Sequence, residues 1–208
     1  MQTIATSLLL VSALGVANSQ PAFAATITDN IVPTGNTGTN TCIEGVLGNA
    51  YLCQSDNAAL NYYATLTGTL ALEAPDATVV ANVITEYGND TDLTGSYDTT
   101  PTYSGSAETD IIYEEGPVPG DVVGFTWCDD DSLGGWLCDQ QYIRIEGAGE
   151  YTHGLTCHET GHAVGLTHGS EANPTKSNSN TGLDCMMNPV PVTKHLGSNS
   201  IGNINNVY

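Results

Sequence analysis

The residues best suited to chemistry lie in one short stretch, His158 to His168, which reads H-E-x-x-H-x-x-G-x-x-H. His158 and His162 are four residues apart, so a helix would place both imidazoles on one face, within reach of one metal ion. Gly165 would let the helix end and the chain turn sharply, because glycine tolerates positive φ. That turn would bring His168 back to the same ion. The spacing therefore predicts a site with three histidine ligands.

The ligand set predicts a catalytic zinc ion. Three protein nitrogens leave the fourth tetrahedral position for water, which distinguishes catalytic from structural zinc. Glu159 follows the first histidine but is rotated around the helix, so it suits contact with that water as a general base. A bare H-E-x-x-H also occurs in helices that bind nothing. The glycine and the third histidine, in a chain with only five histidines, favour one bound Zn²⁺.

The extended motif resembles that of the metzincin metallopeptidases, in which a methionine follows in a tight turn beneath the metal. Downstream the chain reads Asp184-Cys185-Met186-Met187-Asn188-Pro189. This is similar to the C-x-M-x-P turn of adamalysins and the M-x-P turn of matrixins. The resemblance implies that Met187 is the Met-turn residue and Met186 its neighbour, whereas core filling is the alternative for a methionine pair. Pro189 stands where astacins and serralysins place a tyrosine, so phenolic stabilisation is not expected.

The resemblance also implies an α+β fold. A mixed, twisted β-sheet and two long helices, a backing helix and an active-site helix, would lie above a cleft, and a small irregular C-terminal subdomain would carry the Met-turn and a terminal helix. Asp76 caps a predicted helix over 77–87, with Gly88 after its end. Strand-like segments lie at 59–66, 92–97, 110–113, 121–127 and 141–145, and a short helix is predicted over 198–208.

The same resemblance implies how a substrate would bind. The edge strand of the family's sheet pairs with an extended protein or peptide, and residues 122–127 are the candidate for that strand. Strand addition supplies backbone hydrogen bonds without demanding one side-chain sequence. A strand without any ligand is the alternative. Residues 189–193 would form the wall of the S1′ pocket.

Six cysteines, all beyond residue 24, predict disulfides rather than metal ligands or nucleophiles in a secreted chain. Fifteen connectivities are formally open. We predict sequential pairing, in which the last pair would tie the start of the zinc helix to the Met-turn. Cys42 as a latency ligand is the alternative to the first pair. The predicted pairs are Cys42 with Cys53, Cys128 with Cys138, and Cys157 with Cys185.

Residues 1–24 are predicted to be a secretory signal peptide, because they carry no charged side chain, are apolar from Ile4 to Ala17, and end in Ala-Phe-Ala. Residues 25–41 are expected to form a flexible leader. Residues 42–208 would be a single catalytic domain, with an upper subdomain to about 165 and a lower subdomain over 166–208. We therefore expect a secreted, extracellular protein without a membrane anchor, and a monomer.

The charge balance excludes some partners. Twenty-three acidic residues against three basic ones give a formal net charge of −20, so nucleic acid and anionic membrane surfaces are not expected partners. Asp129, Asp130 and Asp131 are consecutive and offer oxygen ligands for Ca²⁺, although a solvated acidic turn is the preferred interpretation. His153 is interpreted as a helix-entry or surface residue, with substrate binding as the alternative.

Together these patterns predict a secreted zinc endopeptidase that hydrolyses peptide bonds through a zinc-activated water, with Glu159 as general base. Two alternatives stay open. One is a zinc-stabilised binding module without activity, and the other is a zinc hydrolase acting on a non-peptide amide or ester. The intact Glu159 argues against the first, and substrate profiling would separate the second.

Overall fold

The computed structural model describes residues 28–34, 42, 45, 47, 53–105, 107–131, 135–147 and 149–208. The predicted signal peptide and the parts of the predicted leader at 25–27 and 35–41 lie outside these residues. Within the described part of the chain, none of the helices has the length and apolar composition that a bilayer-spanning segment needs.

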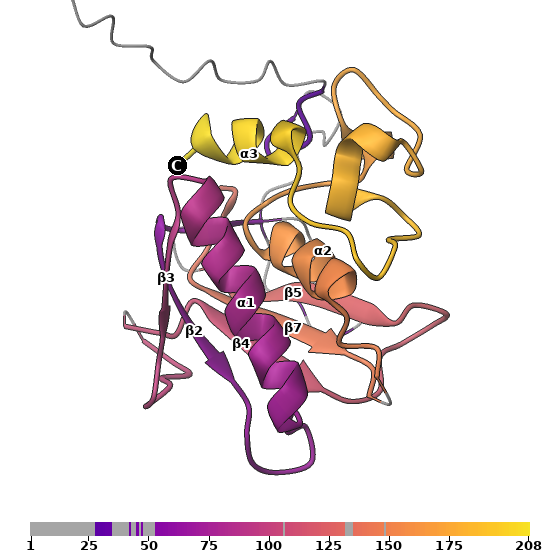
Figure 1. Cartoon of the computed structure of the whole chain (residues 1–208). Helices are drawn as coiled ribbons and strands as arrows, with labels where there is room; N and C mark the ends of the chain where they lie inside the picture. The colour runs from indigo at the N-terminus through magenta and orange to yellow at the C-terminus, as the bar shows by residue number, and fades with distance from the viewer. Residues whose placement is uncertain are drawn as a thin grey trace, which may run out of the picture.

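A five-stranded sheet with the order β3-β2-β4-β7-β5 forms the body of the fold, and two helices lie across it (Figure 1). Neighbours from β3 to β7 are parallel, whereas β5 runs antiparallel to β7 at the edge. The α+β class and the mixed sheet are thus confirmed. Of the predicted edge strand 122–127, residues 124–127 do lie in the edge strand β5, which begins at Gly124. The strands are β2 (Ala59–Ala64), β3 (Thr94–Tyr97), β4 (Ile111–Glu115), β5 (Gly124–Asp130) and β7 (Gln140–Ile145).

Helix α1 (Ala74–Asp90) backs the sheet and is longer than the predicted 77–87. It begins earlier because Pro75 in the first turn suits a helix start. It also continues through Gly88, and Thr91 closes its end by donating its backbone N–H to the Tyr87 carbonyl. The buried residues of the helix are Val80, Val83, Ile84 and Tyr87, which recur at helical spacing.

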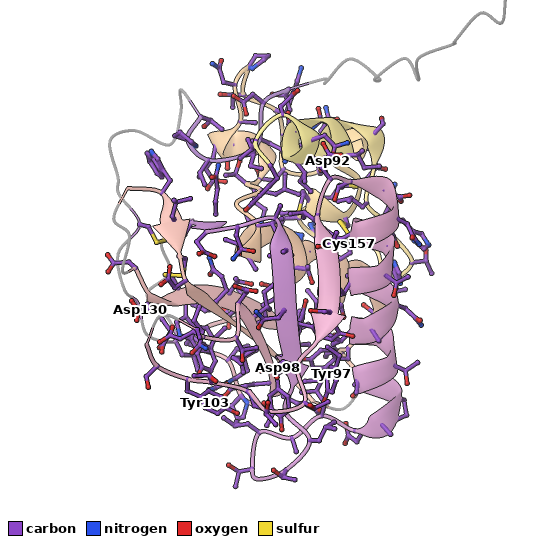
Figure 2. The ribbon with its side chains drawn as sticks, turned by 90° about the vertical axis from the view of Figure 1, so that its left-hand side faces the viewer. Asp92, Tyr97, Asp98, Tyr103, Asp130 and Cys157 are labelled. Atoms are coloured by element: carbon purple, nitrogen blue, oxygen red, sulfur yellow. A yellow bond between two sulfur atoms is a disulfide. The ribbon has the colours of Figure 1, made fainter. Side chains whose placement is uncertain are left out.

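One hydrophobic cluster connects the sheet, both long helices and the C-terminal region. It includes Leu60 and Ile111 from the sheet, Val83 from α1, Met186, and Ile204 from the last helix. At the edge of the sheet opposite β5, all four residues of β3 are exposed to solvent. There Tyr97, labelled in Figure 2, ends β3. Its ring contacts Tyr62 edge-on, with centroids 5.4 Å apart.

Residues 28–34 differ from the flexible leader that was predicted for them. Asp29 pairs with Asn173 and Ile31 pairs with Leu166 in isolated antiparallel bridges, and Val32 is fully buried. The polar composition that suggested a leader instead provides hydrogen bonds, as where the Asn30 side chain donates to the Thr167 carbonyl at 2.9 Å. This segment is therefore part of the folded domain.

The three predicted disulfides are all present: Cys42–Cys53, Cys128–Cys138 and Cys157–Cys185. Cys42 is consequently not free to act as a latency ligand. The first two bonds lie together beside a two-stranded parallel sheet that was not predicted, formed by β1 (Gln54–Ser55) and β6 (Leu137–Cys138).

The chain after the long helices is short and irregular, as expected. It contains two 3-10 helices, η1 (Gly169–Glu171) and η2 (Thr181–Met186), and the terminal helix α3 (Ser198–Asn205). The terminal helix was predicted over 198–208. It packs near the 28–34 segment, where the Asn199 side chain accepts a hydrogen bond from the Thr28 backbone N–H at 2.9 Å.

Three carboxyl groups meet where α1 begins and β4 ends: Glu73, Asp76 and Glu115. Burial raises the pKa of Glu115 to about 7, and the neighbouring Glu73 and Asp76 act in the same direction. A raised carboxyl pKa means that the native state holds its proton more tightly than the unfolded state. This contribution to stability is therefore present at low pH and is lost as the pH rises from about 4.5 to about 7.

Glu115→Gln is expected to remove this pH dependence. The amide carries no charge at either pH. The free energy of unfolding of the variant, relative to that of wild type, should therefore increase between pH 5 and pH 8 by on the order of 1 kcal/mol after solvent screening. Urea unfolding at the two pH values measures the difference. Asp92→Asn, which neutralises an exposed carboxyl, is the control. An equal pH dependence in wild type and Glu115→Gln would contradict the prediction.

Candidate metal centre and cleft

Helix α2 (His153–Ala163) carries the first two histidines of the motif. Its N-terminus is capped by Thr152, whose side chain accepts a hydrogen bond from the Leu155 backbone N–H. The helix ends at Ala163, and Gly165, two residues later, has φ +92° as its predicted role requires. A side chain at Gly165 would also collide with Gln54 and Val32. The chain can therefore turn back immediately after the helix and return His168 to it.

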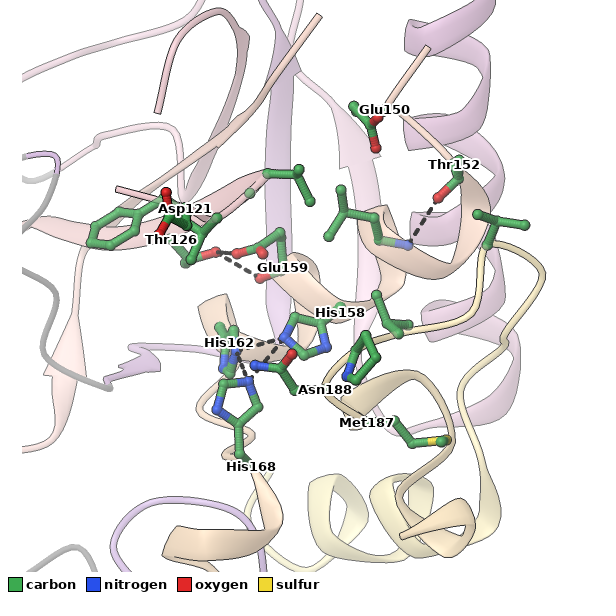
Figure 3. A pocket seen from close by; sticks show the side chains of 18 of the residues that line it. Asp121, Thr126, Glu150, Thr152, His158, Glu159, His162, His168, Met187 and Asn188 are labelled. Carbon is green, nitrogen blue, oxygen red and sulfur yellow. Dashed lines mark hydrogen bonds between the residues drawn. The ribbon is translucent and has the colours of Figure 1, made fainter. Parts of the chain in front are cut away.

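The three predicted ligands come together, as Figure 3 shows. The Nε2 atom of His158 lies 3.1 Å from that of His162 and 3.0 Å from that of His168, and the third separation is 3.2 Å. Helix α2 and the tight turn after it thus bring three ring nitrogens within reach of one metal ion.

The hydrogen bonds of the Nδ1 atoms show whether Nε2 of the same ring carries a proton or a lone pair. Nδ1 of His158 lies 2.7 Å from the Cys185 carbonyl oxygen, and Nδ1 of His162 lies 2.8 Å from the Leu166 carbonyl oxygen. A carbonyl can only accept, so both Nδ1 atoms carry the proton in the neutral rings. Their Nε2 atoms therefore present lone pairs toward each other and toward His168. A cation at the centre is the group that would satisfy them.

The electrostatics favour neutral rings. Burial, together with the nearby His168, lowers the pKa of His158 to about 4. Burial and the other two histidines hold the pKa of His162 well below its usual value, and burial also lowers the pKa of His168. Neutral imidazole is the form that binds a metal.

The geometry fits zinc. Zn–N bonds of about 2.0–2.1 Å at tetrahedral angles place ligand nitrogens about 3.3 Å apart, close to the 3.0–3.2 Å separations of the three Nε2 atoms. The outer hydrogen bonds from two rings to backbone carbonyls are those that orient histidine ligands in metalloproteins. His158, His162 and His168 can therefore hold a metal ion, and their nitrogen chemistry suits zinc better than calcium.

Glu159 is buried beside this centre, with 5% of its surface exposed, and still lines the cleft. Burial raises its carboxyl pKa to about 7, and the hydrogen bond from Thr126 acts in the opposite direction. That bond joins Thr126 Oγ1 to Glu159 Oε2 at 2.7 Å (Figure 3). A pKa near neutrality suits a group that accepts and returns a proton. Thr126 was not singled out from the sequence, because only the fold aligns β5 with α2.

Gly124 leaves the space in which this carboxylate stands. A Cβ at Gly124 would lie 2.5 Å from Oε1 of Glu159, so any larger residue must push the carboxylate aside. We expect Gly124→Ala to lower the kcat of the predicted peptide cleavage by about 100-fold, since a shift of about 1 Å in a catalytic group has that order of effect. Steady-state peptide cleavage, beside metal content and thermal midpoint, measures it.

Gly88→Ala is a matched control, because its added Cβ would come no closer than 3.7 Å to any neighbouring atom. That variant should keep wild-type kcat. Retention of wild-type kcat by Gly124→Ala, with its metal bound, would show that the carboxylate position is not critical.

A cleft with a volume of about 590 Å³ opens over the histidines. One side is the edge strand β5 with the residues that precede it, the floor is α2 and His168, and the far wall is the segment after the turn. Gly124, Phe125 and Thr126 represent the strand side. The far wall comprises Met187, Asn188, Pro189, Val190 and Val192. An extended chain laid along β5 would therefore pass over the metal ligands.

The two methionines of the predicted turn separate. Met186 is fully buried, and its sulfur packs against α2 at Gly161, where a side chain would collide with it. Met187 is only partly buried and lines the cleft. The chain turns at Asp184, two residues before Met186, where φ is +49°. The methionine packed beneath α2 is thus Met186, and the Met-turn role of Met187 stays a prediction.

The consecutive aspartates and His153 differ in their surroundings. Among the described residues, the groups of side chains that could share a metal ion do not include Asp129, Asp130 or Asp131. His153 does belong to such a group, together with Glu86 and His195. No local sequence pattern indicates this grouping, because its members are far apart along the chain.

The Cys157–Cys185 disulfide supports the site directly, because the Cys185 carbonyl accepts from His158. Replacing both cysteines by alanine is expected to lower the free energy of unfolding by about 3.5 kcal/mol, given the sequence separation of 28 residues. It should also speed the loss of bound metal to a chelator. Urea unfolding and metal-release kinetics test both effects.

The control for that pair is the double alanine variant of Cys42 and Cys53, which should lose stability but keep its metal-release rate. Equal metal-release rates in the two double variants would contradict a role of the Cys185 carbonyl in holding His158.

A scan against protein-family models and a search of curated proteins each found no match to this chain.

Proposed function

We propose that this chain is a secreted, metzincin-like zinc endopeptidase. The observation that carries the proposal is the convergence of three histidine Nε2 atoms beside a buried carboxylate, in a cleft bordered by the edge strand of the sheet. The three disulfides suit an oxidising, extracellular compartment. No second candidate has an observation of its own in its favour.

His158, His162 and His168 would hold the zinc ion. When bound, zinc polarises a carbonyl group and lowers the pKa of water toward about 7. The other steps belong to side chains of this protein. Glu159 accepts the proton of the attacking water and returns it to the departing amine, and Thr126 holds the carboxylate in place.

Substrate positioning would come from β5 and the opposite wall. β5 is the last strand on its side of the sheet and lines the cleft, so an extended peptide could add to it through backbone hydrogen bonds. Leu155, Val190 and Val192 give the cleft an apolar side, which favours an apolar side chain next to the scissile bond.

The test is cleavage of casein and of a peptide library by the purified protein, with bound metal quantified and a chelator-treated sample in parallel. The expected result is bound zinc and cut peptides in the untreated sample alone. Bound zinc without any cut peptide would support a binding module instead. Turnover of esters or non-peptide amides, but not of peptides, would support the other alternative.

A further inference from the structure

A second cluster of metal-ligand side chains lies outside the cleft. Glu86 comes from α1, His153 is the first residue of α2, and His195 precedes α3. Nε2 of His153 lies 2.7 Å from Oε2 of Glu86, and Nδ1 of His195 lies 2.9 Å from the same oxygen. The two imidazole centroids are 4.2 Å apart. With the three motif histidines, this cluster accounts for all five histidines of the chain.

The carboxylate at the centre is charged and fixed. Burial alone would raise the pKa of Glu86, but hydrogen bonds with His195, the Leu196 backbone N–H and His153 outweigh it and lower the pKa. The Leu196 N–H donates to Oε1 at 2.7 Å, which leaves Oε2 to the two rings. The group is thus oriented from the backbone, in the manner of a carboxylate ligand with an outer hydrogen bond.

Solvent can reach the cluster. The side chain of His195 is 67% exposed and that of His153 is 25% exposed, whereas Glu86 is 14% exposed. Two imidazoles and one carboxylate are a ligand set typical of zinc, and water can complete the coordination from the open side. A hydrogen-bonded clamp without metal would use the same three side chains, so an experiment has to separate the two.

We propose that Glu86, His153 and His195 form a second zinc-binding site. The ligand atoms are Oε2 of Glu86, Nε2 of His153 and Nδ1 of His195. When zinc is bound, each ring carries its proton on its other nitrogen. The ion takes the place of the two hydrogen atoms that lie between the ring nitrogens and Oε2 in the metal-free protein. The site requires no activity in the cleft and is independent of the proposed peptidase function.

The second site lies next to the end of the cleft wall. Beside His153, the Gly154 backbone N–H donates to the Val192 carbonyl at 2.9 Å, and Val192 belongs to the cleft wall. His195 follows on that same segment. Zinc at this second site therefore fastens the end of the wall to α1 and to the start of α2.

Equilibrium dialysis of the full chain against buffered zinc tests the proposal. Wild type is expected to bind two zinc ions, and His195→Asn and Glu86→Gln one each, because affinity at this site should fall by about 100-fold or more. Both replacements retain hydrogen-bonding groups, so a clamp would survive them better than a metal site would. Asp90→Asn, an exposed charge loss near the end of the same helix, should still bind two.

The outcomes separate the two sites. One zinc in wild type and none in His195→Asn would support the second site and contradict zinc binding in the cleft. Equal zinc content in wild type, His195→Asn and Glu86→Gln would overturn the second site. In wild type, NMR signals of the His153 and His195 ring nitrogens should shift as zinc is added, and unchanged signals would overturn the proposal without any variant.

Discussion

Glu159→Gln is expected to lower the kcat of peptide cleavage by about 1000-fold, within the range that general acid–base groups contribute. The amide keeps the size of the side chain and can still hydrogen-bond to Thr126, whose hydroxyl lies 2.7 Å from Oε2 in the wild type. It cannot accept the proton of the attacking water. The loss should therefore fall on turnover, with little change in KM.

Metal content and stability separate this effect from damage to the site. Because Glu159 is not one of the three convergent nitrogen ligands, the variant should bind as much zinc as wild type. Removing a buried carboxyl with a raised pKa should also not destabilise the fold. Near-normal turnover by a zinc-loaded Glu159→Gln protein would mean that another group is the base.

Removal of the metal from the three-histidine centre should abolish cleavage and lower the thermal midpoint by about 10 °C. Without a cation, the Nε2 lone pairs of His158 and His162 face one another at 3.1 Å, and we expect these two rings to separate. Burial opposes protonation, since it lowers the pKa of His158 to about 4. The metal-free site is therefore expected to open locally.

Thermal unfolding and peptide cleavage, measured before and after chelation and again after adding back Zn²⁺ or Ca²⁺, test this prediction. Zinc should restore both properties, and calcium should restore neither. A thermal midpoint and an activity that are insensitive to chelation would contradict a metal centre at these histidines. Recovery with calcium alone would point to an oxygen-ligand site elsewhere.

The centre could be predicted because its determinants are local. His158, Glu159, His162, Gly165 and His168 occupy one helix and the turn after it, so spacing alone fixes their relative positions. The disulfides follow a related logic. Cys42 with Cys53 and Cys128 with Cys138 are separated by 11 and 10 residues, and short loops cost the least entropy to close.

Local sequence patterns do not predict features that depend on contacts between distant parts of the chain. Residues 28–34 carry a polar composition typical of a leader, but their partners are Leu166 and Asn173. β1 and β6 have two residues each, too few to show a period. Glu86 lies on a predicted helix, yet nothing near it in the sequence indicates His153 or His195. In each case the partner lies too far along the chain for local patterns to reveal it.

The bonds between the 28–34 segment and α3 also bear on the order in which the protein folds. Asn30 accepts hydrogen bonds from the side chains of Asn199 and Asn203, across 169 and 173 residues, and its own carbonyl accepts from the backbone N–H of Thr167, beside the last motif histidine. Contacts of such long range form late and slow the folding of a domain. A growing chain that already contains the whole motif would thus still lack the support for His168. We therefore expect the metal centre to gain this support only after synthesis has reached α3.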